Sequence, residues 1–438
     1  MDSLLTWFHT RPVTAVFVGI VLYLALIRLL RFQRVRALKK KHGYGPSLNA
    51  IASDRKVGNG FPRIAGRPDV KLTLRQVQEI TRVVNQLKMP GLMRIAVAFA
   101  LFKTYSIPTI SEILLQSKQL STAENVSKRY ADTAVLISTW TNCPIVDLTK
   151  MNLKKEGADP RHVIAIARTN WLHSRWPNIK NEDFVYTMSL FVLEPIRWAR
   201  LYGWRELLPI EQEAFFVLWK EIGHRMNIRD IPETLQDLID WTEEYEESAM
   251  VPAQSNYEVG QHTLDYILSN FTERFGVRKI MRQISLCLIE PRVRTAFLCV
   301  SFLREASPVA QAMTSFVMSF FVIKARYFDL PRFKRVEYVP RHVPHEKLKE
   351  KLPRFHPAIF DKVPWYKPEP KGIGRIWQII LLKIGYLDEE DIPSSKYKSE
   401  GYRLEECGPI TLEQVGHAEV MKMAAEIQGC PITGIWAR

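Results

Sequence analysis

Near its N-terminus the chain has an apolar segment that is stable only where it is shielded from water. Pro12–Ile27 (PVTAVFVGIVLYLALI) carries no charge, and with Leu29 and Leu30 it reaches the length needed to cross a bilayer. A cleaved signal peptide would have its positive charges first and a small-residue cleavage site afterwards, and neither is present. We therefore predict a membrane anchor over residues 1–31, with the span at residues 12–30.

The charges around this segment predict its orientation. Six lysines and arginines lie between residues 31 and 41, whereas Arg11 is the only one before the span. The positive-inside rule then places the N-terminus in the lumen and the body in the cytosol. Residues 32–60 are expected to form a basic linker between the anchor and the body.

Composition narrows the class of protein. The net charge of +15 is spread along the chain, and no zinc knuckle, aromatic RNA-binding motif or basic zipper is visible. Nucleic acid is therefore not an expected partner. The five cysteines are scattered without a CxxC pair, which indicates a reducing compartment and argues against a disulfide framework or a zinc finger.

Between residues 61 and 330 the sequence predicts an all-α domain. Thr73–Leu87 has apolar residues at helical spacing behind a threonine cap, and Asp159-Pro160 predicts a helix start with the aspartate as cap. Few strand-like alternations occur. The run 309–323 (VAQAMTSFVMSFFVI) is nearly all apolar but short for a second span, so we expect a buried helix or a tunnel wall.

Residues 331–438 differ in composition and predict a Pro-rich, basic arm and tail. Arg332–Pro370 is rich in Pro, Lys, Arg and His, which is typical of an extended arm. Ile373–Leu387 (IGRIWQIILLKIGYL) is short, amphipathic and basic. It is expected either on the membrane surface or packed on the body.

Polar residues interrupt three otherwise apolar helices. His173 lies on a half-apolar helix face, and Arg129 and Thr133 stand one helical turn apart, with Asp132 placed to pair with Arg129. An arginine near a single histidine suits a haem or an anionic oxygen species. The plainer alternative is a core histidine together with helix-surface ion pairs. The third polar group, on the next helix, consists of Tyr186, Glu194 and Arg197.

Other cofactor and nucleotide classes lack their motifs. A cytochrome P450 needs a cysteine in a Gly-rich loop, and the surroundings of Cys407 do not match. A membrane desaturase needs several histidine boxes, and a di-iron bundle needs two ExxH motifs, of which only Glu221–His224 is apparent. No GxGxxG, P-loop, GxSxG or HExxH occurs.

Four long runs carry a family resemblance: FKTYSIPTISEILLQSKQLSTAENVSKRYADTAVLI, ARTNWLHSRW, YTMSLFVLEPIRWARLYGWRE and DWTEEYEESAMVPAQSN. They resemble the fungal ER-bound oxygenase MpaB family of the mycophenolic acid biosynthesis type, over residues 15–330. The wider superfamily resembles the latex clearing protein, a rubber oxygenase with an all-helical, globin-like core and a b-type haem. The resemblance thus implies a globin-like fold, haem b, O2 and a single-pass location in the endoplasmic reticulum membrane.

The resemblance also implies roles for individual residues. His173 matches the axial haem histidine, and Arg129 and Thr133 match the Arg and Thr of the rubber oxygenase's distal motif. Asp132 departs from that motif, because the rubber enzyme has a lysine there. Tyr186 falls where many superfamily members have a histidine. The implied metal ligand is His173, the implied cofactor-binding residues are His173, Arg129 and Arg168, and the implied catalytic residues are Arg129, Asp132, Thr133 and Tyr186.

The function implied by this resemblance is a haem-dependent oxidation with O2. Its most specific form is cleavage of a C=C bond in a prenylated or other lipophilic metabolite of fungal secondary metabolism. Such a substrate would partition into the bilayer and reach the site past residues 309–323 or 332–370. The alternative is a non-catalytic, membrane-bound helical scaffold or lipid-binding protein that kept the fold but not the iron, and a Soret band would separate the two.

Overall fold

The computed structural model describes residues 12–41, 72–120, 122–145, 159–273, 276–297, 307–384, 387 and 391–437. Helices dominate these residues, which contain no β-strand and a single isolated antiparallel bridge between Phe355 and Tyr402. The predicted all-α class with an N-terminal apolar helix is therefore confirmed. Most of the predicted basic linker, residues 42–60, lies outside the described residues.

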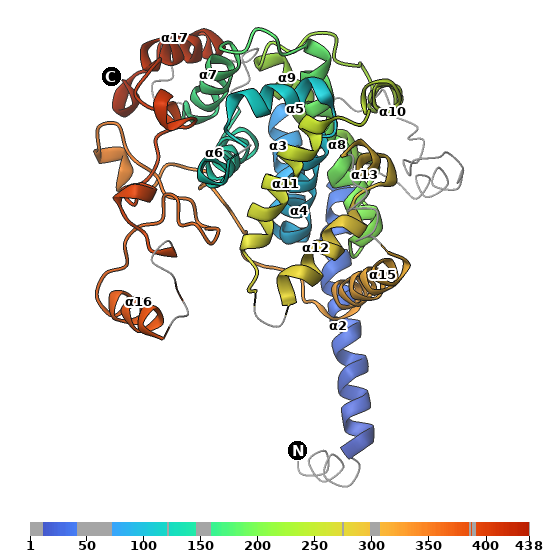
Figure 1. Ribbon diagram of the computed structural model, residues 1–438. Helices are drawn as coiled ribbons and strands as arrows, with labels where there is room; N and C mark the ends of the chain where they lie inside the picture. The colour runs from blue at the N-terminus through green and yellow to red at the C-terminus, as the bar shows by residue number, and fades with distance from the viewer. Residues whose placement is uncertain are drawn as a thin grey trace.

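Helix α2 (Pro12–Lys41) projects from the body (Figure 1). Its first half exposes apolar side chains, and Val13–Leu38 is long and apolar enough to cross a membrane. Farther along the helix, Ile27, Arg31 and Val35 are buried. The helix is therefore both a candidate span and the attachment of that span to the protein.

The core is built around α8 (Asn181–Tyr202), which buries every residue from Met188 to Ala199. α8 packs against α4 (Pro90–Thr104) and α9 (Pro209–Arg225). A helix that is apolar on all sides is stable only when neighbours cover it. α6 (Ala123–Asn142) and α7 (Arg161–His173) pack against each other. The other helices of the body are α3 (Leu74–Val83), followed by the π-helix Val84–Lys88, α5 (Pro108–Ser117), α10 (Leu235–Ala249), α11 (Gln254–Ser269), α12 (Val277–Leu288) and α13 (Pro291–Ala296).

Two predicted helix starts can be compared with the structure. Thr73 caps α3 as predicted, because its side chain accepts a hydrogen bond from the backbone N–H of Gln76. Before α7, however, Pro160 occupies the cap position and the helix begins at Arg161. The Asp159 carboxylate instead accepts hydrogen bonds from the Arg161 backbone at 3.1 Å and from its guanidinium at 2.7 Å. The predicted start is therefore wrong by one residue.

The C-terminal segment is packed on the body. After Pro331 the described chain is mainly irregular, with turns, short 3-10 helices and two α-helices, α16 (Ile373–Lys383) and α17 (His417–Gln428). α17 packs against α7 (Figure 1). At Gly416 (φ +80°) a Cβ atom would meet the Trp171 ring at 2.1 Å, so only glycine allows this close approach of the tail to α7.

Helix α15 (Pro308–Ile323) contradicts the sequence prediction of a buried helix, whereas the alternative of a tunnel wall is not contradicted, because one side of α15 lines a cavity of 620 Å³. Only Ala310 and Thr314 are buried, whereas the Phe316 side chain is 76% exposed. Pro308–Phe328 is long and apolar enough to count as a second candidate span. The prediction of a buried helix failed because α15 packs on α12 along one stripe, which leaves its other apolar residues uncovered by the described part of the chain.

Candidate functional site

An apolar cavity of 160 Å³ lies where α4, α5, α6, α7 and α8 meet. Most of its wall is aliphatic or aromatic, which suits an apolar ligand oriented by a few polar groups. The lining residues with polar side chains are Thr104, Tyr105, Arg129, Tyr130, Thr133, His173, Asp183 and Thr187.

His173 ends α7 and lines this cavity. The centroid of its ring lies 5.1 Å from that of Phe184, and within the described part of the chain neither ring nitrogen has a hydrogen-bond partner. Burial and the nearby charge of Arg129 lower the pKa of His173 to about 4. The imidazole is therefore neutral near pH 7 and offers a nitrogen lone pair to a metal.

Arg129 and Thr133 line the same cavity from α6. The Thr133 hydroxyl donates to the backbone carbonyl of Arg129 at 2.7 Å. No carboxylate among the described residues pairs with the Arg129 guanidinium. An unpaired guanidinium beside a neutral imidazole suits an anionic ligand, because a charged donor forms its strongest hydrogen bonds with an anion. The structure thus brings Arg129 and Thr133, which their spacing put on one face of α6, together with His173 of α7.

Asp183 is another polar group of this cavity. Its position in the sequence gave only a weak indication of a functional role. An acid in the first turn of α8 is ordinarily explained by the helix dipole. In the structure its Oδ1 accepts hydrogen bonds from Thr109 and Tyr245, each at 2.7 Å, while the buried Oδ2 has no partner. A buried oxygen without a donor is costly unless a ligand or water supplies one.

Asp132 does not line the cavity. Its carboxylate accepts hydrogen bonds from the Lys128 ammonium at 2.7 Å, from the backbone N–H of Gly408 at 2.9 Å and from the Tyr366 hydroxyl. The predicted pair with Arg129 is therefore wrong. Since Gly408 and Tyr366 belong to the C-terminal segment, Asp132 fastens α6 to that segment.

Tyr186 also lies outside the cavity wall. Its hydroxyl donates to Glu246 at 3.2 Å, and burial raises the pKa of Tyr186 well above its usual value. Glu246 in turn pairs with Lys103 at 2.7 Å. Tyr186 therefore belongs to a buried ion-pair cluster, and its position does not support the predicted catalytic role.

Arg168 has a comparable structural task. Its guanidinium donates to the backbone carbonyls of Cys407 at 2.7 Å, Leu412 at 2.8 Å and Val415 at 3.0 Å. With its donors committed to the C-terminal segment, Arg168 does not line the cavity. The predicted contact between Arg168 and a cofactor has no support from this position.

The region that contains the cavity matches a known protein family. Residues 114–317 match the family described as ER-bound oxygenase mpaB/B'/Rubber oxygenase, catalytic domain. This stretch contains Arg129, Thr133, His173 and Asp183. The family match thus covers most of the polar groups of the cavity.

Three relatives extend the comparison beyond that domain. The chain is 27% identical to the ER-bound oxygenase mpaB' of Penicillium brevicompactum over 435 residues, covering 94% of this chain and 92% of the relative. It is 30% identical to mpaB of Penicillium roqueforti (strain FM164) over 310 residues, covering 67% of this chain and 93% of the relative. The mpaB of Penicillium brevicompactum is 29% identical over 310 residues, covering 65% and 71%. The chain therefore belongs to the ER-bound oxygenase mpaB and rubber oxygenase family and is an oxygenase.

Proposed function

We propose that this oxygenase is haem-dependent and uses O2 to oxidise a prenylated or otherwise lipophilic metabolite, with cleavage of a C=C bond as the expected reaction. The observation that carries the proposal is the meeting of His173, Arg129 and Thr133 at one apolar cavity. An apolar wall favours a lipophilic substrate, and the few polar groups are of the types that an oxygen-using haem site needs.

The donor set of the cavity fits a haem. A haem needs one axial side chain from the protein because the porphyrin supplies the other nitrogens, and His173 is the single histidine of the lining. Among the described residues, no group of three or more His, Cys, Asp or Glu side chains is placed to hold a metal ion directly. The cavity volume of 160 Å³ is below the roughly 300–1,000 Å³ usual for ligand pockets, so we expect the surrounding helices to separate when the group enters.

Each polar residue of the cavity has a task in this proposal. Haem b, when bound, would supply the iron centre for the reaction with O2. His173 would hold its iron, and Arg129 would donate charge-assisted hydrogen bonds to an anionic group in the cavity. The free Oδ2 of Asp183 is available to accept the N–H of a metal-binding imidazole, the usual way such a ring is oriented.

Haem content tests the proposal directly. The full-length protein, purified in detergent from haem-sufficient cells, is expected to show a Soret band, a pyridine haemochrome and equimolar haem. O2 consumption should depend on a lipophilic, prenylated substrate. A protein that stays free of haem after haem is supplied would contradict the proposal and favour the scaffold or lipid-binding alternative.

Arg129→Gln is expected to lower turnover about 10²–10³-fold, because removal of one preorganised donor from an anion site has effects of this size. The melting temperature should change little, since Arg129 has no ion pair in the described structure to lose. The measurement compares steady-state turnover and thermal melts with those of Arg200→Gln, a half-buried arginine near the far end of α8. Unchanged turnover in Arg129→Gln would remove the guanidinium from the proposed site.

The proposed location is the endoplasmic reticulum membrane, with one crossing by α2 and the body in the cytosol. The relatives are named ER-bound, and Val13–Leu38 is a candidate span. The cytosolic orientation follows from the lysines and arginines at residues 31–41. Protease added to intact microsomes should digest the body, and protection until detergent is added would reverse the orientation.

A further inference from the structure

Helix α15 presents an apolar stripe with no protein cover in the described part of the chain. Its exposed residues recur at intervals of three and four, so they share one helix face. One of them, Phe316, is 76% exposed. A contiguous row of exposed apolar side chains usually marks a site of contact with a protein or a membrane. The stripe consists of Val309, Met313, Phe316, Phe320 and Ile323.

Helix α16 presents a second stripe of the same kind. The helix has 11 residues and none of them is buried. Isolated helices of fewer than about 12–15 residues are marginal in water, so α16 needs a surface to rest on. Its basic residues are Arg375 and Lys383. Its exposed apolar residues include Ile373, Ile376, Trp377 and Ile380, and the exposed Ile384 directly follows the helix.

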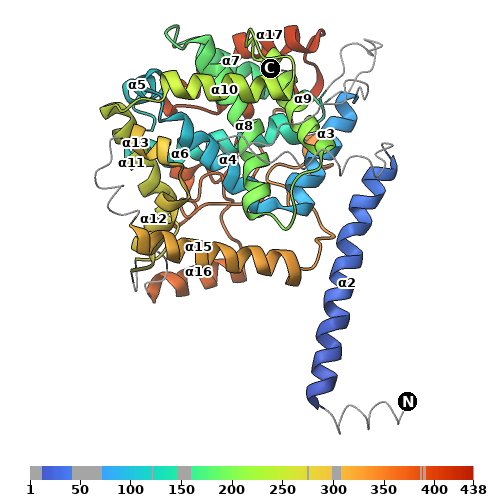
Figure 2. The ribbon, with the colours of Figure 1, turned by 90° about the vertical axis from the view of Figure 1, so that its right-hand side faces the viewer.

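Both helices lie at the end of the body from which α2 projects. In Figures 1 and 2 α15 and α16 form the lower part of the body, and α2 continues beyond them. Figure 2 shows both helices running across the direction of α2. The Arg31 guanidinium donates to the backbone carbonyl of Arg326 at 2.9 Å, and the Tyr23 hydroxyl donates to that of Phe328 at 2.8 Å. These contacts fix the chain after α15 beside the part of α2 that adjoins the body. A bilayer crossed by α2 would therefore meet the apolar stripes of both helices.

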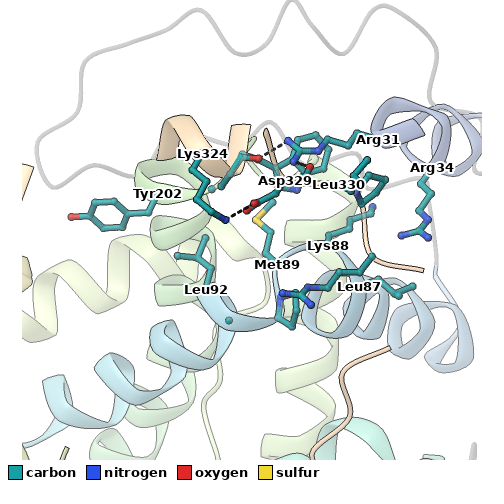
Figure 3. Close-up of a pocket in the computed structure, with 17 residues that line it drawn as sticks. Arg31, Arg34, Leu87, Lys88, Met89, Leu92, Tyr202, Lys324, Asp329 and Leu330 are labelled. Carbon is teal, nitrogen blue, oxygen red and sulfur yellow. Dashed lines mark hydrogen bonds and ion pairs between the residues drawn. The ribbon is translucent and has the colours of Figure 1, made fainter. Parts of the chain in front are cut away.

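The charge of this end suits a lipid surface. A cavity of 380 Å³ lies where α2 joins the body, and Figure 3 shows Arg31, Arg34, Lys88 and Lys324 around it. With Arg332, the lining has five cations and a single acid, Asp329. Arg31 is buried against backbone carbonyls, and the Lys88 side chain forms a buried ion pair with Glu211 at 2.7 Å. The cations open to headgroups are Lys324 and Arg332, with Arg34 half-buried. Exposed basic residues next to exposed apolar helices are the pattern of a protein seated on anionic headgroups.

α15 is not a second crossing, although it is long enough to be one. The chain after it returns to the body, where the backbone N–H of Val336 donates to the carbonyl of Gln86 at 2.9 Å. Farther on, Arg161 of α7 donates to the carbonyls of Pro340 at 2.9 Å and Arg341 at 2.8 Å. A crossing by α15 would place these contacts on opposite sides of the bilayer.

We infer that α15 and α16 are in-plane membrane helices that seat the body on an anionic leaflet, next to the single crossing by α2. Their apolar stripes enter the boundary between headgroups and acyl chains, and the basic residues contact the headgroups. This seating fixes the orientation of the body on the membrane at several points, whereas a single crossing would leave the body free to rotate about that helix. The inference does not depend on the identity of the cofactor.

Site-directed spin labels in the full-length protein test this inference. Cysteines are introduced at Val309→Cys and Phe320→Cys in α15 and at Ile376→Cys in α16, after the accessible native cysteines have been replaced by serine. The matched control is Ile410→Cys, which is 59% exposed and precedes α17. The labelled proteins are reconstituted in vesicles of phosphatidylcholine and phosphatidylserine. Collision with lipid-soluble oxygen is then compared with collision with a water-soluble nickel chelate.

The expected result is severalfold shielding from the nickel chelate at 309, 320 and 376, at one shallow depth, with the label at 410 open to water. In vesicles without phosphatidylserine this shielding should decrease. Labels at 320 and 376 that are as open to the chelate as 410 would overturn the inference. So would depths for 309 and 320 that place them in opposite leaflets, or shielding from both reagents, which would indicate a second protein copy on these faces.

Discussion

His173→Ala is expected to purify as a folded, membrane-bound protein that contains no stoichiometric haem and has no oxygenase activity. The imidazole is neutral, with its pKa lowered to about 4 by burial and by Arg129, and it lines the cavity without a hydrogen bond to the described part of the chain. Its removal therefore deletes the proposed axial ligand and breaks no protein contact of comparable strength. The helix should survive, because alanine has the highest helix propensity.

His162→Ala provides a matched control on the same helix. His162 is buried in α7, and its Nδ1 donates to the backbone carbonyl of Trp140 at 3.0 Å. This variant should lose stability but keep haem, because His162 does not line the cavity. Haem-to-protein absorbance ratios, haemochrome spectra and circular dichroism at equal protein concentration separate the two outcomes. A haem-loaded, active His173→Ala protein would refute the ligand, and His224 or His262 would be tested next.

Asp132→Ala is expected to destabilise the protein by about 3–5 kcal/mol, the range for breaking a buried ion pair by removing one partner. The carboxylate is fully buried, and its loss leaves the Gly408 N–H and the Tyr366 hydroxyl without their acceptor. Lys128 would keep only its contact with Glu413 at 3.0 Å among its carboxylate partners. The C-terminal segment should loosen from α6, and denaturant unfolding with limited proteolysis of that segment would measure both effects.

Glu233→Ala is the control for Asp132→Ala. Glu233 also pairs with a lysine at 2.7 Å, but its side chain is 87% exposed. Exposed pairs contribute about 0–1 kcal/mol, so this variant should unfold almost like the unmodified protein. If Asp132→Ala instead kept its stability and lost only turnover, Asp132 would act in catalysis, as its place in the family motif first implied.

Local sequence patterns were sufficient to predict those features that depend on residues close together in the chain. Apolar spacing and the cap at Thr73 predicted helices, because a helix is stabilised by residues a few positions apart. The spacing of Arg129 and Thr133 likewise fixed their common face, since one helical turn separates them. The candidate span in α2 could be predicted because an uncharged apolar run of this length is typical of a membrane-crossing helix.

Contacts between segments that are distant in the sequence could not be predicted from local patterns. The sequence favoured Arg129 as the partner of Asp132, yet the ion pair of Asp132 is with Lys128, one helical turn before it. Asp132 also binds Tyr366 and Gly408, which lie more than two hundred residues later. Arg168 was likewise taken for a cofactor contact, although it binds carbonyls of the C-terminal segment. A charged residue on a helix has several possible partners, and spacing alone does not choose among them.

The order of amino acids thus predicted an all-α protein with an N-terminal candidate membrane span and with a histidine and an arginine suited to a cofactor. Only the three-dimensional arrangement decided that His173, Arg129, Thr133 and Asp183 share one cavity and that Asp132, Tyr186 and Arg168 serve other contacts. It also decided that α15 is exposed rather than buried. The physical reason is that helix formation depends on neighbours along the chain, whereas burial and charge pairing depend on which surfaces meet after the chain has folded.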